Sequence, residues 1–391
     1  MSGLRIVMAM IEPPLPLGNA AGRWYYVLLR ELVRRGHRVT AFACCSNPAD
    51  FGRTREYFPS DRYDLRLYGF PERGGARAKL DTLRRPYSYM WSEELAFDFE
   101  AEVARGCDVI HLEQLWAAWL ALKHVEKTLV NVHYFSFIDQ AEIRDRDPRA
   151  WSRRQLNFWA ERRLVRTFRR FRSCSSRIAT EIERLNPRSV VDTVPFGIDA
   201  SLYDYVPAEK RGEAPRILLT GSMGWHPSSS AAIRLLERLW PEISRRVPDA
   251  QVDIVGWEAK RVLGRYVGMD RVNIEENVPS TRPYFERASV LLYAPSRGSG
   301  MKMKVLEAMG YGIPVVTTTE GVEGLAAVDG VHAAIADDDE ALIERTVALL
   351  ASPARQNAQR ESARRLLETY CGPSRTVDEI EAIYARMTAG A

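Results

Sequence analysis

The feature that most constrains this chain is a repeated alternation between short apolar segments and longer segments with helical spacing. The apolar run Leu4–Met10 is followed by a helical pattern over Arg23–Arg35 and then by a second strand-like segment, Arg38–Cys44. A buried parallel strand appears in sequence as such an apolar run, and a helix that covers a sheet shows a 3.6-residue period. Strand–helix–strand units of this kind fold into parallel sheets with right-handed crossovers.

The alternation occurs twice, and a polar break separates the two series. Residues 203–215 contain Pro207, Gly212 and Pro215, which are typical of a linker. In the first series we expect further strands over Leu65–Tyr68, Asp108–Leu112, Thr128–His133 and Val190–Pro195. Helices are expected over Ser92–Ala104 and Leu115–Val125. In the second series we expect strands over Arg216–Thr220, Gln251–Val255, Val272–Glu275, Val290–Ala294, Pro314–Thr317 and Ala333–Ala336.

The pattern predicts an α/β protein of two doubly wound, Rossmann-like parallel-sheet domains that face each other across a cleft. We expect the first domain over residues 1–200 and the second over residues 201–373. A final helix, at about residues 374–391, is expected to return to the first domain. Ligands of such sheets bind beyond the carboxyl ends of the strands, so the loops that follow strands are the places to look for functional residues.

Composition places the chain among globular proteins and excludes several other classes. Of its 391 residues, 46% are hydrophobic and 27% are charged, whereas a disordered chain has fewer apolar residues. No run approaches the roughly 18 apolar residues of a membrane span, and the run Ile6–Ile11 is too short for a signal-peptide core. The five cysteines show no metal-ligand spacing, so we expect no disulfide framework and a cytoplasmic protein.

The strongest motif is the segment Val290–Gly312, which has the pattern of a strand, a loop and a helix. Gly298 and Gly300 make the loop tight and open, and backbone N–H groups in such a loop and in the next helical turn bind anions. Lys302 and Lys304 stand beside it, although only 7 of the 55 basic residues are lysines. Because an ammonium group is a compact charge that suits phosphate, the segment predicts a phosphate site.

Glu307 is the third polar feature of this segment, one turn into the expected helix. There its carboxylate would accept hydrogen bonds from a ribose diol. The alternative is a solvated loop followed by an ordinary helix acid. Convergence of glycines, lysines and an acid at one strand end favours the functional interpretation.

The segment resembles the donor-binding motif of the large family of retaining glycosyltransferases with the GT-B fold. It is most similar to bacterial sugar transferases with a G-x-x-x-K-V-L-E-A-M block. The resemblance spans most of the chain, including Leu4–Thr40, Arg85–Tyr87, Asp108–Gln114, Asn131–His133, Pro195–Asp199, Thr220–Pro227, Pro248–Gly256 and Gly321–Leu325. It implies that the second domain binds a nucleotide-diphosphate sugar of the UDP or GDP type, and that the first binds a hydroxyl acceptor.

The chain departs from the family pattern at three positions. The family has two acids eight positions apart, but the first position is Ser299 here and only the second, Glu307, is an acid. The usual arginine after the first strand of the second domain falls at Ser222, and its lysine partner falls near Pro227. The nearest basic residues that could replace this diphosphate clamp are Arg297, Lys302 and Lys304. Lys304 and Glu307 match the family block, whereas Lys302 is inferred from charge alone.

In the first domain, the resemblance makes His133 the expected catalytic residue, facing the sugar and the acceptor. It would hydrogen bond to the donor sugar or to the acceptor hydroxyl, or transfer a proton near neutral pH. The alternative for His133 is a histidine that caps the core. The GNAAG loop resembles the family's glycine pair, and two polar residues follow a strand, so the expected acceptor-binding residues are Asn19, Ala20, Ala21, Glu113 and Gln114.

Two further features concern the donor and possible metals. Trp225 follows TGSMG and would shape the base or diphosphate pocket, or else pack as a structural residue. Asp145 and Asp147 resemble a D-x-D metal motif, but they precede Pro148 outside a strand–turn context, so we expect no metal. The first strand is not followed by G-x-G-x-x-G, which argues against a dinucleotide oxidoreductase. No cofactor is therefore expected.

An arginine-rich segment is the remaining unusual feature. Residues 144–177 hold 12 arginines against 3 acids, whereas charges balance elsewhere, so no nucleic-acid partner is expected. Trp151–Phe171 is expected to form an amphipathic helix that packs on the first sheet and leaves a solvated basic face. Alternatively, this helix docks on an acidic membrane surface or an anionic acceptor, which would make the protein peripheral at the inner membrane face.

Together these features predict a retaining, metal-independent glycosyltransferase that moves a sugar to a hydroxyl acceptor. The acceptor would be a saccharide, a lipid-linked sugar or a small natural product. By resemblance, the leaving phosphate would help to deprotonate the acceptor on the face from which it departs. Two alternatives stay open: a nucleotide-sugar epimerase or hydrolase of the same fold, and a non-catalytic scaffold that binds sugars or membranes.

Overall fold

The computed structural model describes residues 3–16, 20–45, 50–57, 61–71, 75–144, 147–206 and 214–389. The chain divides into two compact units. Unit 1 comprises Met1–Phe137, Arg144–Ile198 and Pro373–Ala391. Unit 2 comprises Ile138–Ile143 and Asp199–Gly372. The C-terminal helix α15 (Pro373–Thr388) therefore belongs to unit 1.

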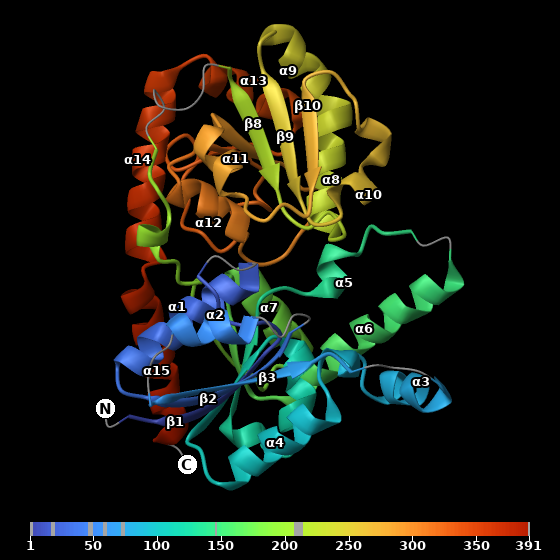
Figure 1. Cartoon of the computed structure of the whole chain (residues 1–391), viewed down its shortest axis with the longest axis vertical. Coiled ribbons are helices and arrows are strands. Elements are labelled where there is room, and N and C mark those ends of the chain that lie inside the picture. Colours follow the sequence, from blue (N-terminus) through green and yellow to red (C-terminus); the bar gives the residue numbers. More distant parts are fainter. Residues whose placement is uncertain are drawn as a thin grey trace. The chain divides into compact units, whose positions relative to one another are not determined.

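Unit 1 contains a seven-stranded sheet with the order β3-β2-β1-β4-β5-β6-β7, and every neighbouring pair is parallel. Its strands are β1 (Arg5–Met10), β2 (Arg38–Cys45), β3 (Tyr63–Gly69), β4 (Val109–Glu113), β5 (Thr128–Val132), β6 (Arg170–Ser173) and β7 (Val190–Thr193). All five residues of β4 and of β5 are buried, as the apolar runs in the sequence predict. Figure 1 shows α1 (Ala20–Arg34) on one face of β1, β2 and β3, and α4 (Glu93–Ala104) on the other.

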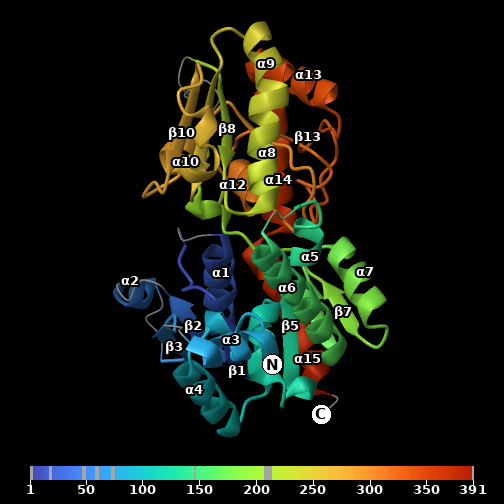
Figure 2. The same cartoon turned by 90° about the vertical axis from the view of Figure 1, so that its right-hand side faces the viewer.

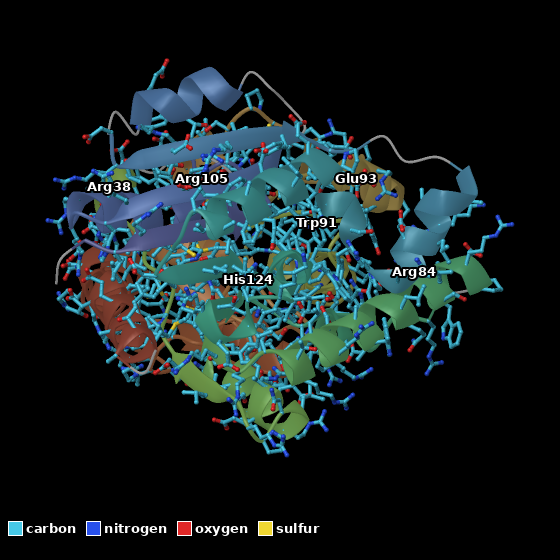
Figure 3. The ribbon with its side chains drawn as sticks, turned by 90° about the horizontal axis from the view of Figure 1, so that it is seen from below. Arg38, Arg84, Trp91, Glu93, Arg105 and His124 are labelled. Atoms are coloured by element: carbon cyan, nitrogen blue, oxygen red, sulfur yellow. The ribbon has the colours of Figure 1, made fainter. Side chains whose placement is uncertain are left out.

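The other helices of unit 1 are α2 (Asp50–Tyr57), α3 (Gly75–Arg84), α6 (Pro148–Thr167) and α7 (Ser176–Leu185), and α5 (Ser136–Asp139) lies where the chain enters the Ile138–Ile143 segment of unit 2. Figure 3 shows Arg84 at the end of α3, and Trp91 and Glu93 at the start of α4.

Two expected helices are wrong in detail. The segment expected as a helix over Leu115–Val125 forms a 3₁₀-helix over Leu115–Ala121. Trp151–Phe171 is not one helix, because α6 ends at Thr167 and Phe171 lies in β6.

Unit 2 contains a six-stranded parallel sheet with the order β10-β9-β8-β11-β12-β13. Its strands are β8 (Arg216–Thr220), β9 (Gln251–Gly256), β10 (Val272–Glu276), β11 (Val290–Tyr293), β12 (Val315–Thr317) and β13 (Ala334–Ile335). Its helices are α8 (His226–Arg234), α9 (Trp240–Arg246), α10 (Ala259–Val262), α11 (Arg282–Arg287), α12 (Met303–Gly310), α13 (Asp339–Leu350) and α14 (Pro353–Tyr370). A π-helical turn, Leu235–Leu239, joins α8 to α9, and Figure 2 shows the resulting long rod.

The two doubly wound parallel sheets predicted from the sequence are therefore confirmed. Each sheet has a point where the strand order reverses, between β1 and β4 in unit 1 and between β8 and β11 in unit 2. Loops that leave such a point diverge to opposite faces, which opens a crevice at the carboxyl ends of the strands. In unit 2 the backbone is close-packed there: a Cβ atom added to Gly256 would lie 1.8 Å from the carbonyl oxygen of Gly221.

Candidate active site

Lys304 occupies the point in unit 2 where the strand order reverses. Its Nζ atom donates a hydrogen bond to Ser228 Oγ at 2.7 Å and lies 4.2 Å from the centre of the Tyr293 ring at the end of β11. A Cβ atom added to Gly221 would lie 2.5 Å from the same Nζ atom. The amine therefore lies between the loops that follow β8 and β11. These two loops are the ones the sequence marks as donor-binding, and the structure brings them together at this lysine.

Burial lowers the pKa of Lys304 to about 7, and the positive charge of Lys302 adds to this effect. Lys302 lies directly before α12, and its amine donates to the carbonyl oxygen of Gly300. An incoming anion would favour the charged form of Lys304, because an opposite charge nearby stabilises an ammonium group. Lys304 would therefore become charged when an anion binds beside it, next to the positive charge of Lys302.

The glycine loop after β11 is held mainly by carboxylates. The Gly298 N–H donates to Glu320 at 3.1 Å. Pro227, the second residue of α8, lies close to this loop, since a Cβ atom on Gly298 would be 3.5 Å from its Cβ atom. Glu307 lies on α12 and is 8% exposed. Arg297 is half-buried, and its Nε atom makes no hydrogen bond to any residue that the structure describes.

Ser299, the position at which the family has an acid, contacts a carboxylate from elsewhere in unit 2. Both its backbone N–H and its hydroxyl donate to Asp139 Oδ1, each at 2.6 Å. Burial raises the pKa of Asp139 to about 6, partly offset by the charge of Lys302 and by the hydrogen bonds from Ser299. An acid is therefore present beside the loop, but Asp139 supplies it. Sequence reasoning missed Asp139 because it is far from Ser299 in the chain and lies in no motif.

The other predicted donor residues are peripheral to the lysine. Ser222 is exposed, in the loop after β8. Trp225 is half-buried and immediately precedes α8, and the Ser228 N–H donates to its carbonyl oxygen at 2.9 Å. This turn places Ser228, which sequence reasoning did not select, against Lys304.

In unit 1, His133 follows β5 and forms a close pair with Glu113, the last residue of β4. His133 Nε2 lies 2.6 Å from Glu113 Oε2. The same oxygen accepts hydrogen bonds from Asn131 Nδ2 at 2.6 Å and Trp24 Nε1 at 3.1 Å. Burial alone would raise the pKa of Glu113, but His111 and His133 lower it well below its usual range. Glu113 is therefore a buried anion. Its carboxylate lies below the protein surface, although we expected it to contact the acceptor directly.

A second layer of buried polar groups lies behind Glu113. His111 Nε2 lies 3.1 Å from Glu113 Oε1, and His111 Nδ1 lies 2.5 Å from the Tyr384 hydroxyl on α15. Arg172, fully buried on β6, donates to Asn131 Oδ1 at 2.8 Å. Sequence reasoning missed these groups. The available signal was His111, a polar residue within the expected strand Asp108–Leu112, whereas Arg172 lay in no expected strand.

The remaining predicted acceptor residues differ in exposure. Gln114 is buried with φ of 81°, and its Oε1 accepts the backbone N–H groups of Leu115 and His133 at 3.2 and 3.3 Å. Its amide therefore shapes the turn after β4. Ala20 and Ala21 begin α1, exposed and half-buried respectively. Asn19 lies outside the described residues.

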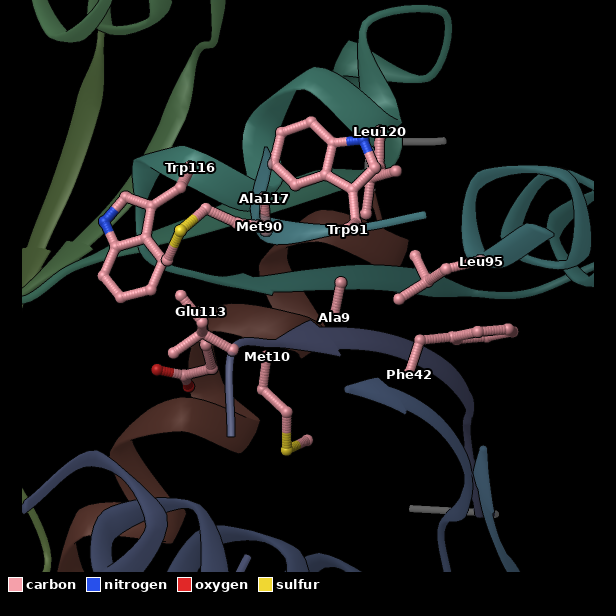
Figure 4. Close-up of a pocket in the computed structure, with 11 residues that line it drawn as sticks. Ala9, Met10, Phe42, Met90, Trp91, Leu95, Glu113, Trp116, Ala117 and Leu120 are labelled. Carbon is pink, nitrogen blue, oxygen red and sulfur yellow. The ribbon is translucent and has the colours of Figure 1, made fainter. Parts of the chain in front are cut away.

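A small cavity lies next to the point where the strand order of unit 1 reverses. Its volume is about 20 Å³, close to the space for one water molecule. Figure 4 shows Trp116 and Met90 on one side of it and Phe42 and Leu95 on the other, with Glu113 below Trp116. The cavity is mainly apolar and far smaller than a sugar.

No metal-binding group of three or more His, Cys, Asp or Glu side chains occurs within the described residues. Asp145 of the D-x-D sequence lies outside them. Asp147 caps α6, since its carboxylate accepts the Arg149 N–H at 2.9 Å. This cap gives Asp147 a structural role. Nor does any helix in the described part of the chain combine the length and apolarity that crossing a membrane requires.

Comparison with known proteins agrees with this arrangement. Residues 21–202 match the family model described as Glycosyltransferase Family 4, and residues 214–352 match Glycosyl transferases group 1. No curated protein sequence matches the chain.

Solved structures are similar to the whole chain. Sucrose-phosphate synthase from Thermosynechococcus elongatus is 16% identical with a TM-score of 0.73, and the match covers 99% of this chain and 100% of that one. Anabaena HepE in complex with UDP and glucose is 12% identical with a TM-score of 0.70, covering 98% and 100%. WaaG, a glycosyltransferase involved in lipopolysaccharide biosynthesis, is 15% identical with a TM-score of 0.66, covering 95% and 98%.

The two doubly wound parallel sheets define the fold class as GT-B, and the family models that match the two parts of the chain define the protein class as a glycosyltransferase. The chain carries the Family 4 glycosyltransferase domain in its first part and the group 1 domain in its second. The resemblance inferred from the sequence motifs is thereby confirmed at the level of family and fold.

Proposed function

We propose that the protein is a retaining glycosyltransferase that transfers a sugar from a UDP- or GDP-type nucleotide sugar to a hydroxyl acceptor. The observation that carries the proposal is Lys304, whose amine lies between the loops after β8 and β11. A diphosphate there would receive charge-assisted hydrogen bonds from the lysine amine, which are stronger than neutral ones. The structure of HepE with UDP and glucose supports this choice of ligand class.

Retention is proposed on the resemblance to the retaining family. A single same-face transfer is proposed rather than a double displacement, because the described glycine loop offers no pair of carboxylates and has Ser299 at the position of one family acid. In the proposed reaction, the bond between the sugar carbon and the diphosphate oxygen breaks, and a bond to the acceptor oxygen forms on the same face. The acceptor proton passes to the departing diphosphate. The anomeric configuration of the product, determined by NMR and compared with that of the donor, tests this step.

Nucleoside diphosphates are expected to raise the melting temperature of the protein, because a ligand that binds only the native state stabilises it by mass action. At a concentration of 100 times Kd the stabilisation is about 2.7 kcal/mol. We expect the shift with UDP or GDP to persist in EDTA, since Lys302 and Lys304 supply the positive charge, and to be small with the nucleoside alone. No shift with any nucleoside diphosphate would contradict the proposed donor. A shift that EDTA abolishes and Mg²⁺ restores would contradict metal independence.

Contact with an anionic membrane surface or a lipid-linked acceptor is proposed for the groove between α3 and α6. This groove of about 650 Å³ is lined by Lys79, Leu83, Arg149, Arg153 and Leu156 among others. Leu83 and the nearby Trp151 are each 53% exposed. Basic and apolar side chains on one surface favour binding to anionic lipid.

The membrane proposal predicts that the protein sediments with vesicles that contain anionic lipid and remains in solution with neutral vesicles. An Arg149→Glu, Arg153→Glu double variant should lose most of this binding, because each basic residue near the surface contributes about 1 kcal/mol. A matched control is Arg245→Glu, which changes an exposed arginine in unit 2. Equal sedimentation of both variants would contradict the proposal and favour an ordinary solvated face.

Two rivals make different predictions. An epimerase or hydrolase would consume the nucleotide sugar without an acceptor, and a scaffold would bind it without consuming it. Product analysis with and without added acceptors separates these cases. The Glu113–His133 pair favours a catalytic protein over a scaffold, because a buried carboxylate that orients a histidine is a common arrangement for proton transfer.

A further inference from the structure

The carboxylate of Glu113 determines which nitrogen of His133 carries a hydrogen. An ionised carboxylate has only acceptor sites, so each nitrogen that approaches it closely must donate. Nε2 of His133 lies 2.6 Å from Oε2, a distance at which an unprotonated nitrogen would place its lone pair against the oxygen. Burial also lowers the pKa of His133, which keeps its ring neutral near pH 7. A neutral ring with its hydrogen on Nε2 has an unprotonated Nδ1.

Among the residues that the structure describes, Asn131 is the neighbour that could favour the other tautomer, since its Nδ2 lies 3.0 Å from His133 Nε2. The same Nδ2 is closer to Glu113 Oε2, at 2.6 Å. Arg172 Nη1 donates to Asn131 Oδ1 at 2.8 Å, which fixes the amide with its NH₂ group toward the carboxylate. Asn131 therefore donates to Glu113 and leaves Nε2 of His133 free to do the same.

Nδ1 of His133 is available to a ligand. The side chain is 11% exposed, and within the described residues Nδ1 has no hydrogen-bond partner. The ring packs against Phe196 and Tyr25, with centroids 4.9 and 6.1 Å away, which limits its rotation. His133 follows β5 at the carboxyl edge of the sheet, where the loops after β1 and β4 also begin.

We propose that Glu113 is a positioning residue that holds His133 as the Nε2–H tautomer, so that Nδ1 accepts a hydrogen bond from a hydroxyl of the reacting sugar or acceptor. The hydrogen on Nε2 follows from the geometry and the neutral ring follows from burial of the side chain, whereas the role of Nδ1 rests on the proposed function. Removing Glu113 would leave the Asn131 amide as the nearest partner of Nε2. Asn131 would then donate to Nε2, and the hydrogen would move to Nδ1, which could no longer accept.

The first arm of the test reads the tautomer directly and needs no substrate. Protein labelled with ¹⁵N-histidine is examined by long-range ¹H–¹⁵N correlation at pH 7.5, with His133→Gln used to assign the signals. We expect wild-type His133 to be neutral with hydrogen on Nε2, Glu113→Met to shift it to the Nδ1–H form, and Glu113→Gln to retain Nε2–H. A wild-type Nδ1–H tautomer, a charged wild-type ring, or an unchanged tautomer in Glu113→Met would overturn the proposal.

The second arm measures turnover. Glu113→Met should lower kcat roughly ten- to hundredfold, the usual effect of losing an orienting partner, with KM for the nucleotide sugar changed less than about twofold. Glu113→Gln should recover most of the activity because its amide oxygen still accepts. Loss of transfer with unchanged hydrolysis of the nucleotide sugar would assign Nδ1 to the acceptor hydroxyl, and equal loss of both would assign it to the sugar. Full activity in Glu113→Met would overturn the proposal.

A matched control separates positioning from loss of stability. Unit 1 contains another histidine–carboxylate pair, in which Nε2 of the buried His37 lies 2.7 Å from the half-buried Glu381. His37 immediately precedes β2, at the opposite edge of the sheet from His133. Glu381→Met should lower the melting temperature and leave kcat unchanged. An equal fall of kcat in both methionine variants would show a general packing effect and overturn the proposal. If the wild type turns over no nucleotide sugar, the proposed function fails, while the first arm still tests the tautomer.

Discussion

Replacing Lys304 with methionine is expected to weaken binding of a nucleoside diphosphate roughly ten- to hundredfold, or about 1.5–3 kcal/mol. The amine is the central cation between the loops after β8 and β11, and methionine keeps the length of the side chain while removing the charge. Calorimetry measures the change. The matched control is Lys260→Met, which alters an exposed lysine of the same unit, 3.0 Å from Glu275. Unchanged affinity in Lys304→Met would remove this lysine from the binding site.

The pH dependence of the same measurement follows from the pKa of Lys304, about 7 in the ligand-free protein. A bound diphosphate raises that pKa, so binding takes up a proton when the free amine is neutral. Affinity is therefore expected to fall as the pH rises from 7.5 to 9, a range in which the phosphate is already fully ionised, with a second pKa of about 6. Lys304→Met should show a flat profile over this range, and a wild-type profile that is equally flat would contradict the assignment.

Replacing Arg172 with methionine is expected to lower the free energy of unfolding by about 3–5 kcal/mol, because it leaves the buried Asn131 Oδ1 without its donor and removes a buried positive charge that interacts with the charge of Glu113. The guanidinium also donates to Pro195 O at 2.6 Å and lies over the rings of Trp24 and Phe196, at 4.6 and 5.0 Å. Burial lowers the pKa of Arg172, because desolvation disfavours the charged guanidinium. The native state therefore already bears part of the free-energy cost of keeping this side chain charged.

Chemical denaturation monitored by fluorescence measures this loss. The control is Arg169→Met on the same chain segment, an exposed residue whose 3.8 Å ion pair with Glu126 should contribute less than about 1 kcal/mol. The free energy of unfolding of Arg172→Lys should lie between those of the wild type and Arg172→Met, because lysine keeps the positive charge but lacks the planar, paired N–H donors of arginine. A loss under 1 kcal/mol for Arg172→Met would show that Glu113 is compensated by the histidines alone.

Much of the fold could be predicted from local sequence patterns. A buried parallel strand needs an apolar run and a covering helix needs a 3.6-residue period, and both signals are local, so the two sheets were predictable without any structure. Helix types were harder to predict. Leu115–Ala121 has helical spacing, yet it forms a 3₁₀-helix after Gln114, whose φ of 81° turns the chain sharply at the end of β4.

The donor side of the site was partly predictable for the same reason. Lys302, Lys304 and the glycines of their loop lie within a few residues of one another, so their convergence on one strand end is visible in the sequence. Ser228 and Asp139 were not predictable, because they reach this loop from distant parts of the chain through tertiary packing.

By itself, the sequence determined the class of fold, the order of most of its elements and the loops that hold polar residues, because each depends on neighbours close in the chain; strand β6 was not expected. Only the tertiary structure decided which of those residues meet and what charge they carry. His133 and Glu113 are both recognisable as residues after strands, but their pairing depends on β4 and β5 lying side by side. Protonation depends on burial and on neighbouring charges, which arise only when strands, helices and loops from separate parts of the chain enclose the same side chain.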